Sequence, residues 1–371
     1  MNISGGSMTD YRVPLYRPSL RGNEAQYVLE CLETSWISAR GRFVAEFESQ
    51  FAPKVGARHG LATCNGTAAL HLAVAGLGLG PGDEVIVPTL TYVACANAVA
   101  YTGAVPVFAD CAADSWQIDP QEIRSSITPR TKAIMAVHLY GQPCELDPIL
   151  ELAQRHKLFV IEDCAEAFGA FYKGRPVGAF GDVAAFSFFG NKTITTGEGG
   201  MIVSNDGSLI ERCRRLRGQG LVPGREYWHD VLGYNYRMSN VAAAIGLAQL
   251  ERADELVRLK RELAQRYFDR LSYLPLKFHR EAPNTVHAYW MVSALTRSEG
   301  ERDGLRHHLA AAGIETRQLF NPLHTMGLHS SRFARKTVAE GIAARGLNLP
   351  SWPDISETEF ELVCRAIDNF F

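Results

Sequence analysis

Long hydrophobic runs are missing from the sequence. No stretch reaches the roughly eighteen apolar residues that a helix needs to cross a bilayer, and no signal-peptide pattern is present. Internal repeats and low-complexity segments are also missing, which argues against a solenoid or a disordered linker. We therefore expect a globular cytoplasmic protein with no membrane partner.

Neither sign of charge is in excess. Lys and Arg number 38 and Asp and Glu number 40, so the formal net charge is -2 at pH 7. This balance provides no basic field for a nucleic acid, and we expect no such partner. The eight cysteines form no CxxC pair and no other metal-ligand spacing. We expect buried free thiols and no metal site.

Strand and helix patterns alternate through the first half of the chain. The sequence predicts strands at 60–64, 84–88, 105–109, 132–138 and 158–163. Between them it predicts helices at 67–79, 92–102, 119–127 and 145–157. Such alternation is typical of a mostly parallel sheet with helices on both faces. The GxGxxG fingerprint of dinucleotide-binding proteins does not occur at these strand-to-helix turns.

After about residue 250 the alternation weakens. Strands are predicted at 286–295 and 314–319, and helices at 301–312, 333–344 and 356–370. This second pattern predicts a smaller α+β domain. The length of 371 residues also favours about two domains.

One lysine, Lys192, stands between two apolar strand patterns at 183–189 and 199–203. The residues around Gly197, Gly199 and Gly200 cannot continue a helix and allow a ligand to approach the backbone closely. A lysine held there becomes a nucleophile when it is desolvated. Taken alone, a solvated surface lysine is the commoner interpretation.

Two further patterns favour a cofactor. Residues 158–164 read as a buried strand that ends in Glu162 and Asp163, where the ligands of open α/β sheets bind. Asp163 either caps the next helix or keeps the ring nitrogen of pyridoxal 5'-phosphate (PLP) protonated. Residues 65–67, Asn-Gly-Thr, open an alanine-rich helix whose first N–H groups and dipole suit a phosphate, although the same residues also form an ordinary helix start.

The chain resembles the sugar aminotransferases of the DegT/DnrJ/EryC1/StrS group. Five stretches carry this resemblance: CNGTAALHLA, VPTLTYVACANAV, VIEDCAEAFGA, FSFFGNKTITTGEGGMIVSND and LGYNYRMSNVAAAIGLAQLE. It implies the α/β fold of PLP-dependent aminotransferases, fold type I, with a mixed, mostly parallel sheet in a large domain and a small α+β C-terminal domain. We place the PLP-binding domain at residues 8–250 and the small domain at 251–371. Residues 1–7 are interpreted as a leader or an expression remnant.

The resemblance also implies the site residues. Those expected to bind the cofactor are Gly66, Thr67, Tyr92, Asp163, Glu166, Ser187, Lys192 and Asn235, of which Lys192 and Asp163 are catalytic. Those expected near the substrate are Trp36, Ser38, Arg317 and His324.

Some of these residues have a competing structural interpretation. Trp36 is equally well explained as a packing residue between helices, Tyr92 as a core residue and His324 as a satisfied surface histidine. Glu166 stands where many members of the group carry Gln or His, and we expect it near the 3-oxygen of the cofactor.

Within the group, SFFGNKTITTGEGGM and IEDCAEAFGA are most similar to enzymes that move an amino group from L-glutamate to C4 of GDP-4-keto-6-deoxy-D-mannose. The resemblance implies a homodimer with shared active sites, because the asparagine matching Asn235 reaches the cofactor phosphate of the neighbouring subunit. A UDP- or dTDP-linked sugar, and amination at C3, stay open.

Two other functions compete with this one. A PLP-dependent sugar dehydratase of the same group carries His at the lysine position, so Lys192 argues against it. A non-catalytic PLP-binding regulator is expected to have a fused DNA-binding segment, and none is recognised ahead of Val13.

Overall fold

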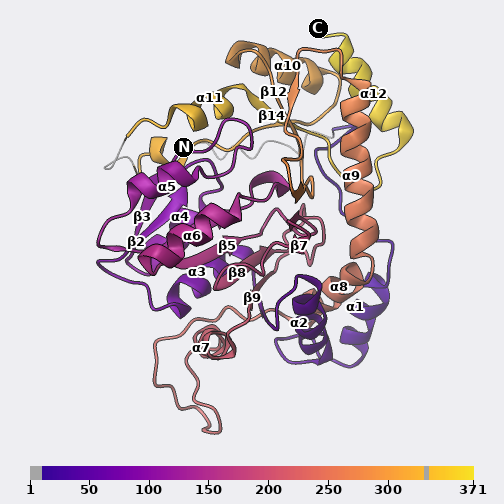
Figure 1. The fold of residues 1–371 in the computed structure, drawn as a ribbon. Coiled ribbons are helices and arrows are strands. Elements are labelled where there is room, and N and C mark those ends of the chain that lie inside the picture. Colours follow the sequence, from indigo (N-terminus) through magenta and orange to yellow (C-terminus); the bar gives the residue numbers. More distant parts are fainter. Residues whose placement is uncertain (1–10, 330–333) are drawn as a thin grey trace.

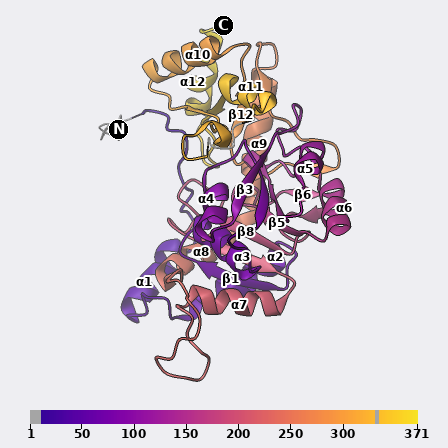
Figure 2. The same ribbon diagram turned by 90° about the vertical axis from the view of Figure 1, so that its left-hand side faces the viewer.

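The computed structural model describes residues 11–329 and 334–371 (Figures 1 and 2). Residues 1–7, which we interpret as a leader or an expression remnant, lie outside these ranges. Within them, no helix is both long enough and apolar enough to cross a membrane.

A seven-stranded sheet forms the centre of the molecule, with the strand order β1-β9-β8-β5-β4-β2-β3. Its strands are β1 (His59–Thr63), β2 (Glu84–Pro88), β3 (Val105–Ala109), β4 (Thr131–Val137), β5 (Phe159–Asp163), β8 (Val183–Ser187) and β9 (Gly200–Ser204). Only β9 runs against its neighbours, β1 and β8, and the other adjacent pairs are parallel. Six strands therefore end at one edge of the sheet. The predicted mixed, mostly parallel sheet is confirmed.

Helices cover both faces of this sheet, as the alternation predicts. They are α2 (Arg42–Lys54), α3 (Gly66–Gly76), α4 (Ala94–Tyr101), α5 (Pro120–Ser126), α6 (Leu146–His156), α7 (Gly207–Arg217) and α8 (Asn240–Glu251), and α1 (Glu24–Glu33) packs on α8. Side chains of α3, α4 and α7 pack with Ile161, Ala185 and Ile202 on one face, whereas those of α2 and α8 pack with Ala184 and Phe186 on the other. Because both faces are covered, β2 and β9 are buried at every residue.

The C-terminal part contains an antiparallel sheet of order β10-β12-β14-β13. Its elements are β10 (Lys277–Phe278), β12 (Val292–Leu295), β13 (Arg317–Gln318), β14 (Gly346–Leu349), α10 (Glu299–Ala311), α11 (Thr337–Arg345) and α12 (Glu357–Asp368). In Figure 1 this part lies at the top, and α9 (Ala253–Arg270) runs down from it toward α8. Helix α12 begins with a capping box between Ser356 and Glu359, the kind of start signal that sequence patterns reveal.

The strand predicted over 286–295 is wrong in its first half. β11 (Thr285–Val286) belongs instead to a small sheet with β6 (Phe171–Tyr172) and β7 (Arg175–Pro176). The next backbone N–H groups, of Ala288 and Trp290, donate to the carbonyls of Gly141 and Tyr140. These bonds hold the segment against the 3-10 turn η1 (Leu139–Gly141), so it is not available to a sheet.

Contacts also cross the proposed boundary at residue 250. Val13 forms a bridge with Ile314, and the Leu15 N–H donates to Glu315 Oε2 at 2.8 Å. The first described residues thus pack against the C-terminal sheet. The division into domains 8–250 and 251–371 stays a proposal.

A substitution at Phe51 tests the aromatic core between α2 and the sheet. Its ring is 0% exposed and lies 5.0 Å from Phe186 and 5.2 Å from Phe188, centroid to centroid. We expect Phe51→Ala to lower the free energy of unfolding by about 3–5 kcal/mol, because it leaves a cavity. In the control, Phe159→Ala, the residue is 39% exposed, so the free energy of unfolding should fall clearly less. Equal shifts in urea midpoint at one protein concentration would contradict this packing.

Candidate active site

A cavity of about 580 Å³ opens at the edge of the sheet where the parallel strands end. Its lining includes residues that follow β1, β2, β5 and β8, as expected for an open α/β sheet. Eight of the twelve predicted site residues line it: Gly66, Thr67, Tyr92, Asp163, Glu166, Ser187, Lys192 and Arg317. The other four, Trp36, Ser38, Asn235 and His324, are not part of the lining.

The N-terminus of α3 and the end of β8 approach each other closely at Gly66. A Cβ atom on Gly66 would lie 2.7 Å from Ser187 Cβ and 3.0 Å from Ser187 Oγ, so only glycine fits there. Asn65 caps the helix by accepting the Ala68 N–H at 2.8 Å. The first N–H groups of a helix have no partner within it and favour an anion. Gly66, Thr67 and Ser187 therefore form a cradle suited to a phosphate.

Asp163 ends β5 and is held from two sides. The Cys95 thiol donates to its Oδ2 at 3.0 Å, and the Ala165 N–H donates to its Oδ1 at 2.9 Å. The next element after β5 is the strand β6, so the helix-cap interpretation of Asp163 is wrong. Asp163 is 5% exposed and lines the cavity, where its carboxylate is placed to hold a proton on a ligand nitrogen.

Lys192 lies on the loop between β8 and β9, as predicted. Its amine sits 3.8 Å from the centroid of the Trp290 ring and 3.8 Å from Glu166 Oε1. The Tyr16 hydroxyl donates to the Lys192 carbonyl at 2.7 Å and fixes the backbone. Burial lowers the pKa of the Lys192 amine, while the Glu166 and Asp163 carboxylates partly oppose this shift. The surface interpretation of Lys192 is wrong, since its side chain is 13% exposed.

Glu166 is buried beside Lys192. Its Oε2 accepts the Tyr140 N–H at 2.7 Å. Burial raises the pKa of this carboxyl to about 7, although Lys192 and the Tyr140 N–H act to lower it. The carboxyl is therefore easier to protonate than that of an exposed glutamate.

The outer wall of the cavity carries Tyr92 and Arg317. Tyr92 is 56% exposed, and its ring centroid lies 5.6 Å from that of Phe320. The core interpretation of Tyr92 is therefore wrong. Arg317 forms an ion pair of 3.3 Å with Glu315, and its side chain is 63% exposed. It is available for an anionic ligand at the mouth of the cavity.

The residues outside the lining fall into two groups. Trp36, Ser38 and Asn235 are exposed, and Trp36 is not packed between helices because 55% of it is accessible. His324 is 1% exposed, which rules out a surface histidine. Its Nδ1 lies 2.6 Å from Thr89 Oγ1, just beyond β2, and its Nε2 lies 3.2 Å from Glu340 Oε1 on α11.

Sequence analysis missed Trp290, Tyr140 and Cys95. Trp290 and Tyr140 stand in segments without any motif and reach Lys192 and Glu166 only through the tertiary fold. The sequence did contain a signal for Cys95. It lies three residues after Tyr92 at the start of a predicted helix, and residues three apart share one face of a helix.

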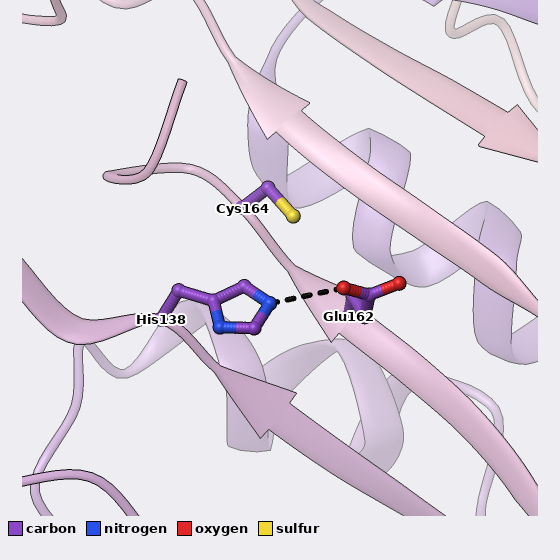
Figure 3. Close-up of side chains that lie close together, drawn as sticks. All are labelled: His138, Glu162 and Cys164. Atoms are coloured by element: carbon purple, nitrogen blue, oxygen red, sulfur yellow. Dashed lines mark hydrogen bonds and ion pairs between the residues drawn. The ribbon is translucent and has the colours of Figure 1, made fainter. Parts of the chain in front are cut away.

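A second cluster, outside the cavity lining, brings together the potential metal ligands His138, Glu162 and Cys164 (Figure 3). The histidine and the carboxylate already have partners. His138 Nε2 lies 3.1 Å from Glu162 Oε2, and His138 Nδ1 accepts the Cys144 N–H at 3.0 Å. Glu162 also accepts three backbone N–H groups, from Gly178, Phe180 and Gly181. The cluster therefore works as a hydrogen-bonded clamp between β5 and the 178–181 turn.

Comparison with known proteins agrees with this geometry. The profile of the DegT/DnrJ/EryC1/StrS aminotransferase family matches residues 18–368. The chain belongs to this family.

Two curated relatives and one solved structure illustrate the similarity. GDP-perosamine synthase of Escherichia coli O157:H7 is 53% identical over 97% of this chain and 98% of its own. The enzyme of that name from Vibrio cholerae is 46% identical over 97% and 99%. The PLP form of Spr1654 from Streptococcus pneumoniae superposes with a TM-score of 0.92 at 25% identity, over 97% of this chain and 98% of that one. The chain is thus a PLP-dependent sugar aminotransferase of fold type I, as predicted.

The residues present fit the cofactor. The cradle at Gly66 suits its phosphate, Asp163 suits its ring nitrogen and the buried Lys192 amine suits its aldehyde. When bound, PLP supplies an electron sink for a carbanion. With the cofactor in place, Asp163 would hold a proton on the ring nitrogen, and the Lys192 amine would be placed to move protons.

Gly66→Ala tests the cradle. The added methyl group would push Ser187 away from the start of α3, so we expect PLP affinity to fall at least about tenfold with the fold kept. The control Gly341→Ala lies on α11, where nothing lies within 4 Å of an added Cβ, and should bind PLP normally. Equilibrium dialysis measures the PLP affinity of both variants. Unchanged affinity in Gly66→Ala would show that the cradle does not bind the phosphate.

Proposed function

We propose that the protein transfers the amino group of L-glutamate to C4 of GDP-4-keto-6-deoxy-D-mannose and so makes GDP-perosamine, a sugar for O-antigen or related polysaccharides. Similarity to curated GDP-perosamine synthases over nearly the whole chain carries this proposal. The amine at the floor of the cavity supports the same chemistry.

Each side chain has a defined task in this proposal. Lys192 removes a proton from the α-carbon of the donor and returns one to the acceptor, as general base and acid. Asp163 keeps the ring nitrogen of the cofactor protonated. Arg317, at the mouth, pairs with the diphosphate of the nucleotide sugar. His324 acts through the segment it anchors, because it connects Thr89 to Glu340 without lining the cavity.

We also propose a homodimer in which each subunit completes the site of the other. The loop at 219–235 projects away from the body of the molecule below α7 (Figures 1 and 2). It carries Tyr227, 92% exposed, and Leu232, 89% exposed, which favours a partner surface. Asn235 at its end would reach the phosphate of the second subunit, and the exposed segment with Trp36 and Ser38 would face the second subunit's substrate.

The chemistry and the sugar can be tested separately. Wild-type protein with PLP should lose its visible absorbance on addition of L-glutamate and regain it with GDP-4-keto-6-deoxy-D-mannose, but not with the UDP- or dTDP-linked keto sugar. Lys192→Ala should reduce turnover by at least about 10²-fold, whereas the exposed control Lys132→Ala should not. Recovery of the visible absorbance with a UDP- or dTDP-linked keto sugar instead would overturn the assigned substrate. Full turnover by Lys192→Ala would overturn the mechanism.

Shared sites predict complementation between two inactive variants. Mixed dimers of Lys192→Ala and Asn235→Ala subunits contain one site with both native residues and one with neither. Because half of randomly mixed dimers are of this kind, activity should recover to about a quarter of wild type. Turnover measured before and after subunit exchange decides this, and a mixture no more active than its separate components would show that Asn235 serves its own subunit.

A further inference from the structure

Lys192 and three other residues form a closed ring of contacts. The amine faces the Trp290 ring at 3.8 Å and Glu166 Oε1 at 3.8 Å. Tyr140 closes the ring, because its side chain stacks on Trp290 with centroids 6.1 Å apart and its N–H donates to Glu166 at 2.7 Å. Glu166 is thus joined to Lys192 on both sides of the ring.

The position of Glu166 is built into the backbone. Tyr140 has φ 56, in the left-handed region that residues with a side chain seldom occupy. Its ring is held by stacking on Phe320 at 5.4 Å, and its hydroxyl accepts the Phe320 N–H at 3.0 Å. This held conformation aims the Tyr140 N–H at Oε2 and leaves Oε1 toward the lysine.

The other ionisable groups around the pair have partners of their own. Asp163 on β5 accepts from Cys95 on α4 and from the Ala165 N–H. Lys260 on α9 donates to the Ser351 carbonyl at 2.6 Å, and burial, with Lys192 nearby, lowers its pKa to about 7. Tyr16 donates to the Lys192 carbonyl, and burial raises the pKa of its phenol. Glu166 is therefore the carboxylate left to exchange a proton with Lys192.

We propose that Glu166 and Lys192 form a proton-sharing pair, in which one proton passes between Lys192 Nζ and Glu166 Oε1 without entering solvent. In the forward direction an N–H bond of the ammonium breaks and an O–H bond forms on the carboxylate, which leaves a neutral amine and a neutral acid. The reverse step restores the ion pair. The two atoms are 3.8 Å apart, so this transfer requires rotation about the last lysine bonds to bring them within hydrogen-bond distance.

The pair gives the amine a way to change its charge inside a desolvated site. Burial raises the pKa of Glu166 to about 7 and lowers the pKa of Lys192, so the ion pair and the neutral pair approach each other in free energy. The use of the pair rests on the proposed function, in which Lys192 must lose and regain a proton. Its existence is a property of the chain by itself.

The test is the titration of Lys192 in the full chain freed of cofactor. The extent of acetylation at Lys192, measured by mass spectrometry across pH, gives its apparent pKa. Glu166→Gln keeps an acceptor for the Tyr140 N–H but removes the negative charge that stabilises the ammonium. We expect the pKa of Lys192 to fall by about one unit or more in this variant. The control Glu198→Gln changes an exposed carboxylate in the same cavity lining and should shift it far less.

The coupling must also appear in the titration of Glu166. In Lys192→Met the carboxyl of Glu166 should titrate higher by a similar amount, read by infrared spectroscopy of labelled glutamate, because the coupling is mutual. An unshifted Lys192 in a folded Glu166→Gln variant overturns the pair even if the enzyme aminates the GDP sugar. A shifted Lys192 supports the pair even if another sugar proves to be the substrate, so the two proposals fail separately.

Discussion

Burial of one amine is the constraint on which this site depends. An ammonium taken out of water is costly, so Lys192 is tolerated only because acidic groups and an aromatic face surround it. Glu166 and Asp163 oppose the effect of burial, and the Trp290 ring accepts the positive charge on its face. The same surroundings that permit the charged form also make the neutral form accessible, which is the state in which an amine attacks a carbonyl.

The sheet brings these groups together through strand direction. Since only β9 is reversed, β1, β2, β5 and β8 all end at one edge, and each contributes a turn that lines the cavity. Reversal of β9 also places Lys192 on the loop between two hydrogen-bonded strands, where the Tyr16 hydroxyl holds its carbonyl. His138 supports this edge twice, because its ring pairs with Glu162 and its backbone N–H donates to the carbonyl of Asp163.

Local patterns predicted the large sheet well and the C-terminal sheet less well. Strands buried on both faces form continuous apolar runs. Asp163 ends such a run, and Gly66 and Lys192 lie in the turns that follow two others. The position of β9 between β1 and β8 follows from long-range pairing, which no periodicity encodes. Strands of two residues, such as β6 and β10, are too short to show a period. Tyr140 and Trp290 stack on each other from segments 150 residues apart, so neither has a local signal.

The cavity lies where the two sheets meet, and this position makes its shape a product of both. Its floor belongs to the large sheet, whereas Trp290, Arg317 and Phe320 come from the C-terminal part. A shared cluster joins the two, with Leu90 and Tyr140 packed against Met291 and Leu319. Tyr140 connects this cluster to the pair of Glu166 and Lys192. Its ring stacks on Phe320 of the C-terminal wall, and its N–H orients Glu166. Movement of the C-terminal wall would therefore change the proton balance at Lys192 as well as the space for a sugar.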